Sequence, residues 1–257
     1  MLQTLGKLFR ADVLSHWSTV DVEGHPVDLY VPDTSNLAGC VLYLHGHGEI
    51  GLTKNRVWTQ LLYDHRLAAV CPHGGRSWWM DRICHDFDDW ISPMDWLRTQ
   101  LMPFVERRIG VTSPRVALLG TSMGGQGVLQ LAYRHARDFP VVAAISPAVD
   151  FHQLYGHGLP LDEMYENIEE ARQETVVLNL HPLAWPRHQF LCCDPVDTDW
   201  FDGCTRLGMK LSSSGIMHER DFETSAGGHS WDYFNQMAPA AFEHIVNGLQ
   251  SVSAAAQ

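Results

Sequence analysis

Short apolar runs alternate with helix-like stretches along most of this 257-residue chain. The runs are apolar at consecutive positions, which is typical of strands that are buried on both faces of a parallel sheet. We expect such strands at 27–31, 41–45, 67–71, 115–119, 141–145 and 189–193. Stretches with helical character lie at 58–65, 95–108, 128–133 and 238–249. The alternation predicts an α/β fold with a mainly parallel central sheet and helices on both faces.

The segment 151–187 interrupts this alternation. It contains several histidines and a polar stretch near 162–174 that has helical character. An insertion at this point would lie over the carboxyl ends of the strands and could line a substrate pocket, and a plain surface excursion is the alternative. No internal repeat or low-complexity tract divides the chain. We therefore treat residues 1–257 as a single domain that carries this insertion.

Composition and charge exclude several classes of partner. Apolar residues make up 45% of the chain and charged residues 19%, which allows a large buried core. The 30 acidic residues outnumber the 18 Lys and Arg, and the formal charge of −12 repels nucleic-acid phosphates and anionic lipids. No stretch reaches the roughly 20 apolar residues that span a bilayer. We expect neither a nucleic-acid partner nor a membrane partner.

The N-terminus and the cysteines indicate a cytoplasmic protein. Residues 1–10 lack the long apolar core and the small-residue cleavage site of a signal peptide. The six cysteines form no Cys-x-x-Cys pair, and the neighbours Cys192 and Cys193 would point to opposite faces of one strand. Buried free thiols are the interpretation that fits this pattern.

The candidate nucleophile is Ser122, at the centre of a Gly-x-Ser-x-Gly pattern over residues 120–124. A strand-like run leads into this pattern and a helical stretch follows it. In such a strand–turn–helix the turn is so tight that side chains beside the serine would collide, and Gly120 and Gly124 remove those Cβ atoms. The serine hydroxyl is then held above the sheet edge, at the positive end of the helix. An ordinary serine in a glycine-rich turn is the alternative, and the strand and helix around it argue against that alternative.

A second glycine-rich turn, Leu44-His45-Gly46-His47-Gly48-Glu49, follows another apolar strand. Acyl transfer to a serine needs two N–H donors for the developing oxyanion. We assign these donors to His47 and Met123, with Gly48 as the alternative to His47. The alternating histidines also permit a metal site, but the pattern supplies no third ligand. We expect no metal and no cofactor.

The candidate general base is His229, because Ala226-Gly227-Gly228-His229 precedes the last helical stretch. Small residues there allow a loop to carry an imidazole over the sheet edge, in the chain order serine, acid, histidine. Four aspartates follow the strand that ends at Cys193, and one of them would hold the histidine in the correct tautomer. We choose Asp197, with Asp199 as its rival.

The remaining aspartates of this stretch have weaker claims. Asp194 precedes Pro195 and has the character of a turn former. We expect an aspartate of this loop that is solvated to tolerate replacement by asparagine. Replacing Asp194 or Asp199 should therefore cost far less activity than replacing Asp197.

These residues resemble the α/β-hydrolase family, and more narrowly the putative-esterase branch that includes esterase D, S-formylglutathione hydrolase and the antigen 85 acyltransferases. The resemblance extends from about Val41 to the closing helix and rests on three motifs, Leu44-His45-Gly46, Gly120-Thr121-Ser122-Met123-Gly124-Gly125 and Gly228-His229-Ser230-Trp231-Asp232. It implies the α/β-hydrolase fold and a serine esterase that works without metal through an acyl-enzyme. The sequence departs from the family pattern at the acid, where Cys193-Asp194-Pro195-Val196-Asp197 replaces a glycine-containing turn.

The sequence thus predicts a hydrolase of carboxylic esters with the triad Ser122, His229 and Asp197. Its partner would be a small-molecule ester, and the chain could form a homo-oligomer. A thioesterase, an acyltransferase or a serine peptidase could use the same triad, and a non-catalytic binding protein of this fold is a further alternative. An aromatic substrate pocket could draw on four tryptophans, which could equally be core residues: Trp78, Trp79, Trp185 and Trp231.

Overall fold

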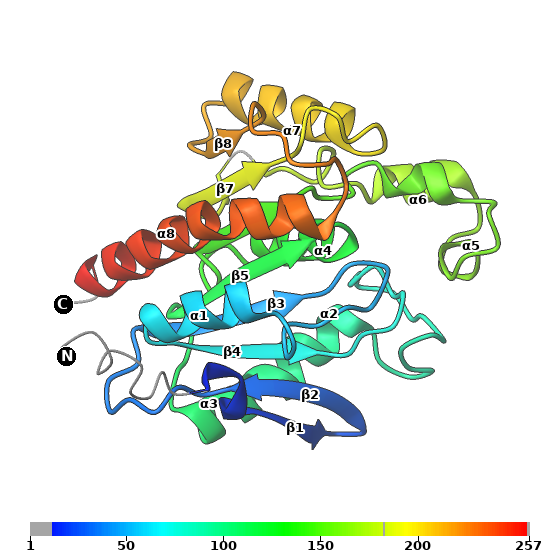
Figure 1. Cartoon of the computed structure of the whole chain (residues 1–257). Helices are drawn as coiled ribbons and strands as arrows, with labels where there is room; N and C mark the ends of the chain where they lie inside the picture. Colours follow the sequence, from blue (N-terminus) through cyan, green and yellow to red (C-terminus); the bar gives the residue numbers. More distant parts are fainter. Residues whose placement is uncertain (1–11, 182, 256–257) are drawn as a thin grey trace.

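The computed structural model describes residues 12–181 and 183–255. Eight strands in this part of the chain form one sheet (Figure 1). The spatial order is β1-β2-β4-β3-β5-β6-β7-β8. β2 pairs antiparallel with β1 and with β4, and all the other pairs are parallel. The mainly parallel sheet is confirmed. The strands are β1 (Trp17–Val22), β2 (His25–Tyr30), β3 (Gly39–Leu44), β4 (Leu67–Pro72), β5 (Val116–Thr121), β6 (Val141–Ile145), β7 (His188–Cys192) and β8 (Glu219–Asp221).

Helices cover both faces of this sheet and bury two apolar cores. Figure 1 shows α1 and α8 across the face turned to the viewer, with α4 behind the strands. Every residue of β3, β4, β5 and β6 is buried, because each of these central strands packs against helices on both sides. The helices are α1 (Arg56–Asp64), α2 (Pro93–Trp96), α3 (Met102–Ile109), α4 (Met123–Arg134), α5 (Leu161–Met164), α6 (Ile168–Gln173), α7 (Phe201–Ser213) and α8 (Trp231–Ala255), with shorter turns η1 (Val13–His16), η2 (Leu97–Leu101) and η3 (Phe151–Leu154).

Two strands have no counterpart among the predicted elements. β1 has one fully buried residue, and because its other positions are partly or fully exposed, its sequence contains no continuous apolar run. β8 is only three residues long and carries the charged side chains of Glu219, Arg220 and Asp221. Both strands lie at edges of the sheet, where burial on two faces is not required.

The helix expected at 95–108 forms in three parts. A π-helical segment, η2, separates α2 from α3, and within it Met102 N–H bonds five residues back to Leu97 O. Pro103 has no N–H to donate to Thr99, so the ordinary α-helical ladder cannot continue through this point. The closing helix α8 begins at Trp231, seven residues before the predicted start, where Ser230 Oγ accepts the N–H of Tyr233 at 3.3 Å.

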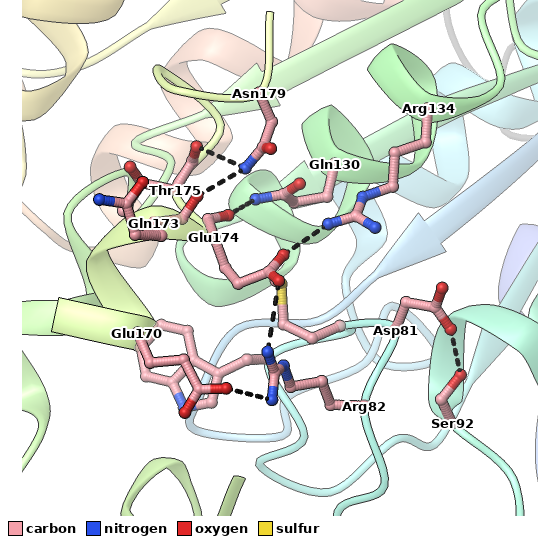
Figure 2. Close-up of polar contacts among 12 residues, drawn as sticks. Asp81, Arg82, Ser92, Gln130, Arg134, Glu170, Gln173, Glu174, Thr175 and Asn179 are labelled. Carbon is pink, nitrogen blue, oxygen red and sulfur yellow. Dashed lines mark hydrogen bonds and ion pairs between the residues drawn. The ribbon is translucent and has the colours of Figure 1, made fainter. Parts of the chain in front are cut away.

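The insertion 151–187 is fastened to the domain by an ionic cluster, which Figure 2 shows in detail. Arg82, in the connection between β4 and α2, lies 2.8 Å from Glu170 and 3.4 Å from Glu174. Arg134 of α4 binds the other carboxylate oxygen of Glu174 at 2.7 Å, and Gln130 Nε2 donates to the Glu174 carbonyl. The insertion is therefore held against α4, the helix that begins directly after Ser122.

The six cysteines all lie in the described part of the chain, and each is buried with a free thiol, as predicted. Within residues 12–181 and 183–255, none of the helices combines the length and the apolar character needed to cross a bilayer.

The turn between β5 and α4 lies in close contact with the end of β3. A Cβ atom built on Gly124 would lie 1.9 Å from the carbonyl oxygen of Leu44, and one built on Gly120 would lie 2.2 Å from the carbonyl oxygen of Gly124. Neither contact involves a flexible side chain that could move aside. Both glycines are therefore required by backbone crowding, as the sequence pattern predicts.

We expect Gly124→Ala to destabilise the protein by about 1–3 kcal/mol, because the added methyl must push β3 away from α4. Gly51→Ala is the matched control, since its Cβ would meet no atom closer than 3.6 Å. The free energies of unfolding of both variants can be measured by urea denaturation. An unchanged midpoint for Gly124→Ala would show that the turn can relax without cost.

Candidate active site

Ser122 occupies a strained position between β5 and α4. Its φ of 57° and ψ of −123° are unusual for any residue other than glycine, and such a conformation costs about 1–3 kcal/mol. The structure holds it in place through the backbone: Ser122 N–H donates to Ile145 O at 3.0 Å, and the Ser122 carbonyl accepts from Gln126 and Ala148. Strain that is held by several contacts at one serine is a feature of nucleophiles on this kind of turn.

The structure brings the three predicted residues Ser122, His229 and Asp197 into one chain of hydrogen bonds. His229 Nε2 lies 2.9 Å from Ser122 Oγ, and His229 Nδ1 lies 2.8 Å from Asp197 Oδ2. A carboxylate only accepts, so Nδ1 carries the proton and Nε2 is free to accept the serine hydroxyl. This is the tautomer that a general base needs.

Asp197 is the buried acid of this chain, and its rival Asp199 is exposed. The Asp197 side chain has no exposed surface, and its second oxygen accepts the N–H groups of Asp199 and Trp200. Burial alone would raise the pKa of Asp197, but His229 and these N–H donors bring it below the ordinary value. The group facing His229 is therefore a carboxylate at neutral pH.

Asp194 lies in the same loop but is not solvated, contrary to our expectation for this position. It has no exposed surface. Its Oδ1 accepts Val196 N–H at 2.9 Å, which is the turn that the sequence suggested. Its Oδ2 accepts Ala226 N–H at 2.7 Å and Gly228 N–H at 2.9 Å, both in the loop that carries His229.

His45 fixes the loop that follows β3. Its Nδ1 lies 2.8 Å from Gly46 O, so that nitrogen donates, and its Nε2 accepts Gly74 N–H at 3.0 Å. Both ring nitrogens are thus engaged within the fold, which contradicts the alternative of a metal ligand at this position. Burial lowers the pKa of His45, so the ring remains neutral and keeps this tautomer near pH 7.

The same contacts set the direction of His47 N–H. Gly46 O accepts from His45 Nδ1 and also from Glu49 N–H at 2.9 Å. In a trans peptide the C=O and the next N–H point in opposite directions, so His47 N–H faces away from these two donors. Gly46 itself lies against Ser122, since a Cβ built on it would be 3.1 Å from Ser122 Cβ. Among the described residues, no hydrogen bond uses the N–H of His47 or Met123.

A cavity of about 250 Å³ opens beside Ser122. Its apolar walls come from Ile50 of the loop after β3 and from Trp231 and Phe234 at the start of α8. None of the residues that line it belongs to the insertion 151–187. The complete lining is Gly46, His47, Gly48, Ile50, Thr121, Ser122, His229, Ser230, Trp231 and Phe234.

The four tryptophans that could form a substrate pocket lie in different parts of the structure. Trp78 and Trp79 are core residues with 1% and 0% exposure, and Trp79 Nε1 donates to His45 O at 3.1 Å. Trp185 lines a separate groove of about 840 Å³, together with Pro114 and Pro140, which precede β5 and β6. That groove therefore lies at the opposite ends of the strands from Ser122, and only Trp231 of the four lines the Ser122 cavity.

A family model described as "Putative esterase" matches residues 25–245, which is most of the chain. The chain belongs to the putative esterase family. No curated protein gives a significant match to it in sequence. Membership makes this protein a hydrolase of the esterase type, in agreement with the predicted class.

Solved structures share the fold of this esterase at low sequence identity. An S-formylglutathione hydrolase from Agrobacterium tumefaciens has a TM-score of 0.76 at 14% identity, covering 91% of this chain and 94% of the other. A ferulic acid esterase scores 0.74 at 14% identity, with 91% and 97% covered. The fluorophosphonate-binding serine hydrolase F of Staphylococcus aureus scores 0.70 at 16% identity, with 87% and 92% covered. These likenesses confirm the predicted α/β-hydrolase fold.

Reasoning from the sequence missed several residues of the esterase's site. Ile50 and Phe234 line the cavity but lie in ordinary apolar contexts. His45 belongs to the motif Leu44-His45-Gly46, but that motif gives no sign that its ring binds Gly46 O and Gly74 N–H. Asp194 gave a turn signal through Pro195, and its contacts to residues 226 and 228 depend on a loop 32 and 34 positions away.

We expect Asp197→Asn to lower kcat by about four orders of magnitude, because an amide can donate to Nδ1 and so favour the wrong tautomer of His229. Asp199→Asn is the matched control, since the Asp199 side chain is exposed and only its backbone N–H contacts Asp197. The measurement is the turnover of a p-nitrophenyl ester by the two variants. Equal losses of kcat would show that Asp197 is not the residue that orients His229.

Proposed function

We propose that this protein is a serine esterase that hydrolyses esters of short acyl groups through an acyl-enzyme intermediate. The observation that carries the proposal is the hydrogen-bonded series Ser122–His229–Asp197, with distances of 2.9 Å and 2.8 Å. Membership of the putative esterase family supports the same class of reaction.

The proposed reaction has two halves. In the first, His229 Nε2 takes the Ser122 proton while Oγ attacks the ester carbonyl, and the proton then passes to the departing alcohol. In the second, His229 deprotonates water, which attacks the acyl-enzyme, and the proton then passes to Ser122 Oγ as the bond to the acyl group breaks and the acid is released. Asp197 stabilises the imidazolium that forms in each half. Every step uses groups of the chain itself and water.

The N–H groups of His47 and Met123 are the proposed oxyanion donors. Met123 is the first residue of α4, where N–H groups have no partner within the helix and the helix dipole is positive. His47 N–H is oriented by the bonded carbonyl of Gly46. A single donor of this kind is typically worth about 3 kcal/mol of activation free energy.

The size of the cavity supports the restriction to short acyl groups. Pockets for drug-sized ligands usually measure about 300–1,000 Å³, whereas the Ser122 cavity measures about 250 Å³. Core aromatic residues fill the space on another side of the oxyanion loop, where the Trp78 ring lies 5.9 Å from that of His47 and stacks on Phe151. A long acyl chain therefore has little room near the nucleophile.

We expect Ser122→Ala to abolish turnover and labelling by a fluorophosphonate probe, which requires an activated serine, while leaving the thermal unfolding midpoint nearly unchanged. The loss in kcat should approach six orders of magnitude, as for other serine nucleophiles. Ser230→Ala provides a control at a cavity-lining serine that caps α8, and it should keep its labelling. Substantial turnover by Ser122→Ala would assign the reaction to another residue.

We expect kcat/KM for p-nitrophenyl esters to be highest for acetate to butyrate and to fall at least tenfold by octanoate, since displaced side chains cost more than about 1.4 kcal/mol. Ile50→Ala should shift this preference towards longer chains, because Ile50 separates the Ser122 cavity from a neighbouring one of about 310 Å³. Ile83→Ala is the control, as Ile83 is comparably exposed and lines neither cavity. Rates that rise with chain length in the unmodified protein would contradict the short-acyl assignment.

A further inference from the structure

Two separate segments must meet to place the imidazole of His229 over Ser122. One is the loop after β7, which carries Asp197, and the other is the connection 222–230 between β8 and α8. The second segment is conformationally permissive at its end, because Gly227 and Gly228 have φ values of 91° and 71°. Some other contact must therefore restrict where the histidine lies.

Asp194 joins these two segments through hydrogen bonds. Its Oδ2 accepts the N–H groups of Ala226 and Gly228 at 2.7 and 2.9 Å, and the second of these donors is the residue directly before His229. The two segments are in van der Waals contact here, since a Cβ built on Gly228 would lie 3.4 Å from Val196 O. Asp194 and Asp197 thus hold the backbone and the ring of the same histidine segment.

The environment of Asp194 is that of a carboxylate kept ionised by N–H donors. It has no exposed surface, and within the described residues no Lys, Arg or His pairs with it. Burial favours its neutral form, yet the N–H donors of Val196, Ala226 and Gly228, together with the hydroxyl of Ser225, keep the pKa of Asp194 below its ordinary value. Hydrogen bonds to an ionised acceptor are about twice as strong as neutral ones.

We propose that Asp194 is a positioning residue for catalysis, which binds the backbone of the His229 loop and so sets the distance from His229 Nε2 to Ser122 Oγ. The role is separate from that of Asp197, which contacts the imidazole. It rests on the proposed function, because the placement of His229 matters for turnover only if His229 is the base.

Two substitutions separate the cross-loop role of Asp194 from its local turn. In Asp194→Asn the amide oxygen can replace Oδ2 and still accept both Ala226 N–H and Gly228 N–H, while its NH₂ group faces Val196 N–H, so mainly the local turn is lost. In Asp194→Ser the short hydroxyl can still accept Val196 N–H in a local turn, but it cannot reach Ala226 and Gly228. Asp194→Ser also remains informative if Asp194→Asn does not fold.

The control is Asp221→Asn. Asp221 accepts the N–H groups of Glu223 and Thr224 in the earlier half of the same connection, with no contact to residues 226–229. It is a partly buried aspartate that holds the same segment by the same kind of bond. The variant should therefore keep nearly the kcat of the unmodified protein.

The test compares steady-state kinetics and amide hydrogen exchange. We expect Asp194→Ser to lose about 100-fold in kcat, the cost of a misplacement of roughly 1 Å, with a much smaller change in KM. Asp194→Asn should lose less, because its amide oxygen can still accept both loop N–H groups. The amides of Ala226 and Gly228 should exchange slowly in the unmodified protein, in Asp221→Asn and in Asp194→Asn, and rapidly in Asp194→Ser. Unchanged kcat in Asp194→Ser, or unchanged exchange at these two amides in that variant, would overturn the proposal.

A double-mutant cycle shows whether the effect passes through His229. In a His229→Ala background, Asp194→Ser should lower the residual turnover no further. A loss as large as in the unmodified protein would mean that Asp194 acts through general stability, and would also overturn the proposal. If the unmodified protein neither hydrolyses esters nor reacts with a fluorophosphonate, the proposed function fails, while the exchange experiment still reports whether Asp194 holds the loop.

Discussion

The contact between the β5–α4 turn and the end of β3 is the constraint on which the rest of the site depends. β3 and β5 are parallel neighbours in which Leu44 pairs with Gly120, so their carboxyl ends reach the same level of the sheet. With Gly124 almost touching the Leu44 carbonyl, the serine turn and the loop of His47 become neighbours. Ser122 and His47, the proposed nucleophile and the proposed oxyanion donor, lie far apart in sequence and are placed together by strand pairing.

Around this contact, the molecule uses backbone N–H groups to hold its buried carboxylates. Asp194 and Asp197 each accept two or more such donors, although the chain as a whole carries an excess of acidic residues. An arginine or lysine at this point would compete with His229 for Asp197 and would place a second cation beside a forming imidazolium. Dipolar donors keep both carboxylates ionised without that competition, which is compatible with the role of general base that we propose for His229.

The parts of the fold that follow from continuous apolar runs could be predicted, and the parts that follow from pairing could not. The apolar runs at 41–45, 115–119 and 189–193 predict β3, β5 and β7, because a strand that is buried on both faces is apolar at consecutive positions. Edge strands such as β8 contain no such run. In the site, glycine patterns located Ser122 and His229, since tight turns demand particular residues. The role of Asp194 depends on partners more than 30 positions away, and a contact at that separation has no local signature.

His45 is a histidine that stabilises the loop after β3 by remaining neutral. Its ring donates to the Gly46 carbonyl and accepts from Gly74 N–H, which is possible only in one neutral tautomer. A proton added at Nε2 would set two donors against each other and break the bond to Gly74 N–H, while Nδ1 would still donate to the Gly46 carbonyl. The burial that lowers the pKa of His45 therefore extends the range of pH over which the ring keeps its bond to Gly74 as well as its bond to Gly46. A buried, neutral His45 thus connects the loop after β3, which lies against Ser122, to the segment that follows β4.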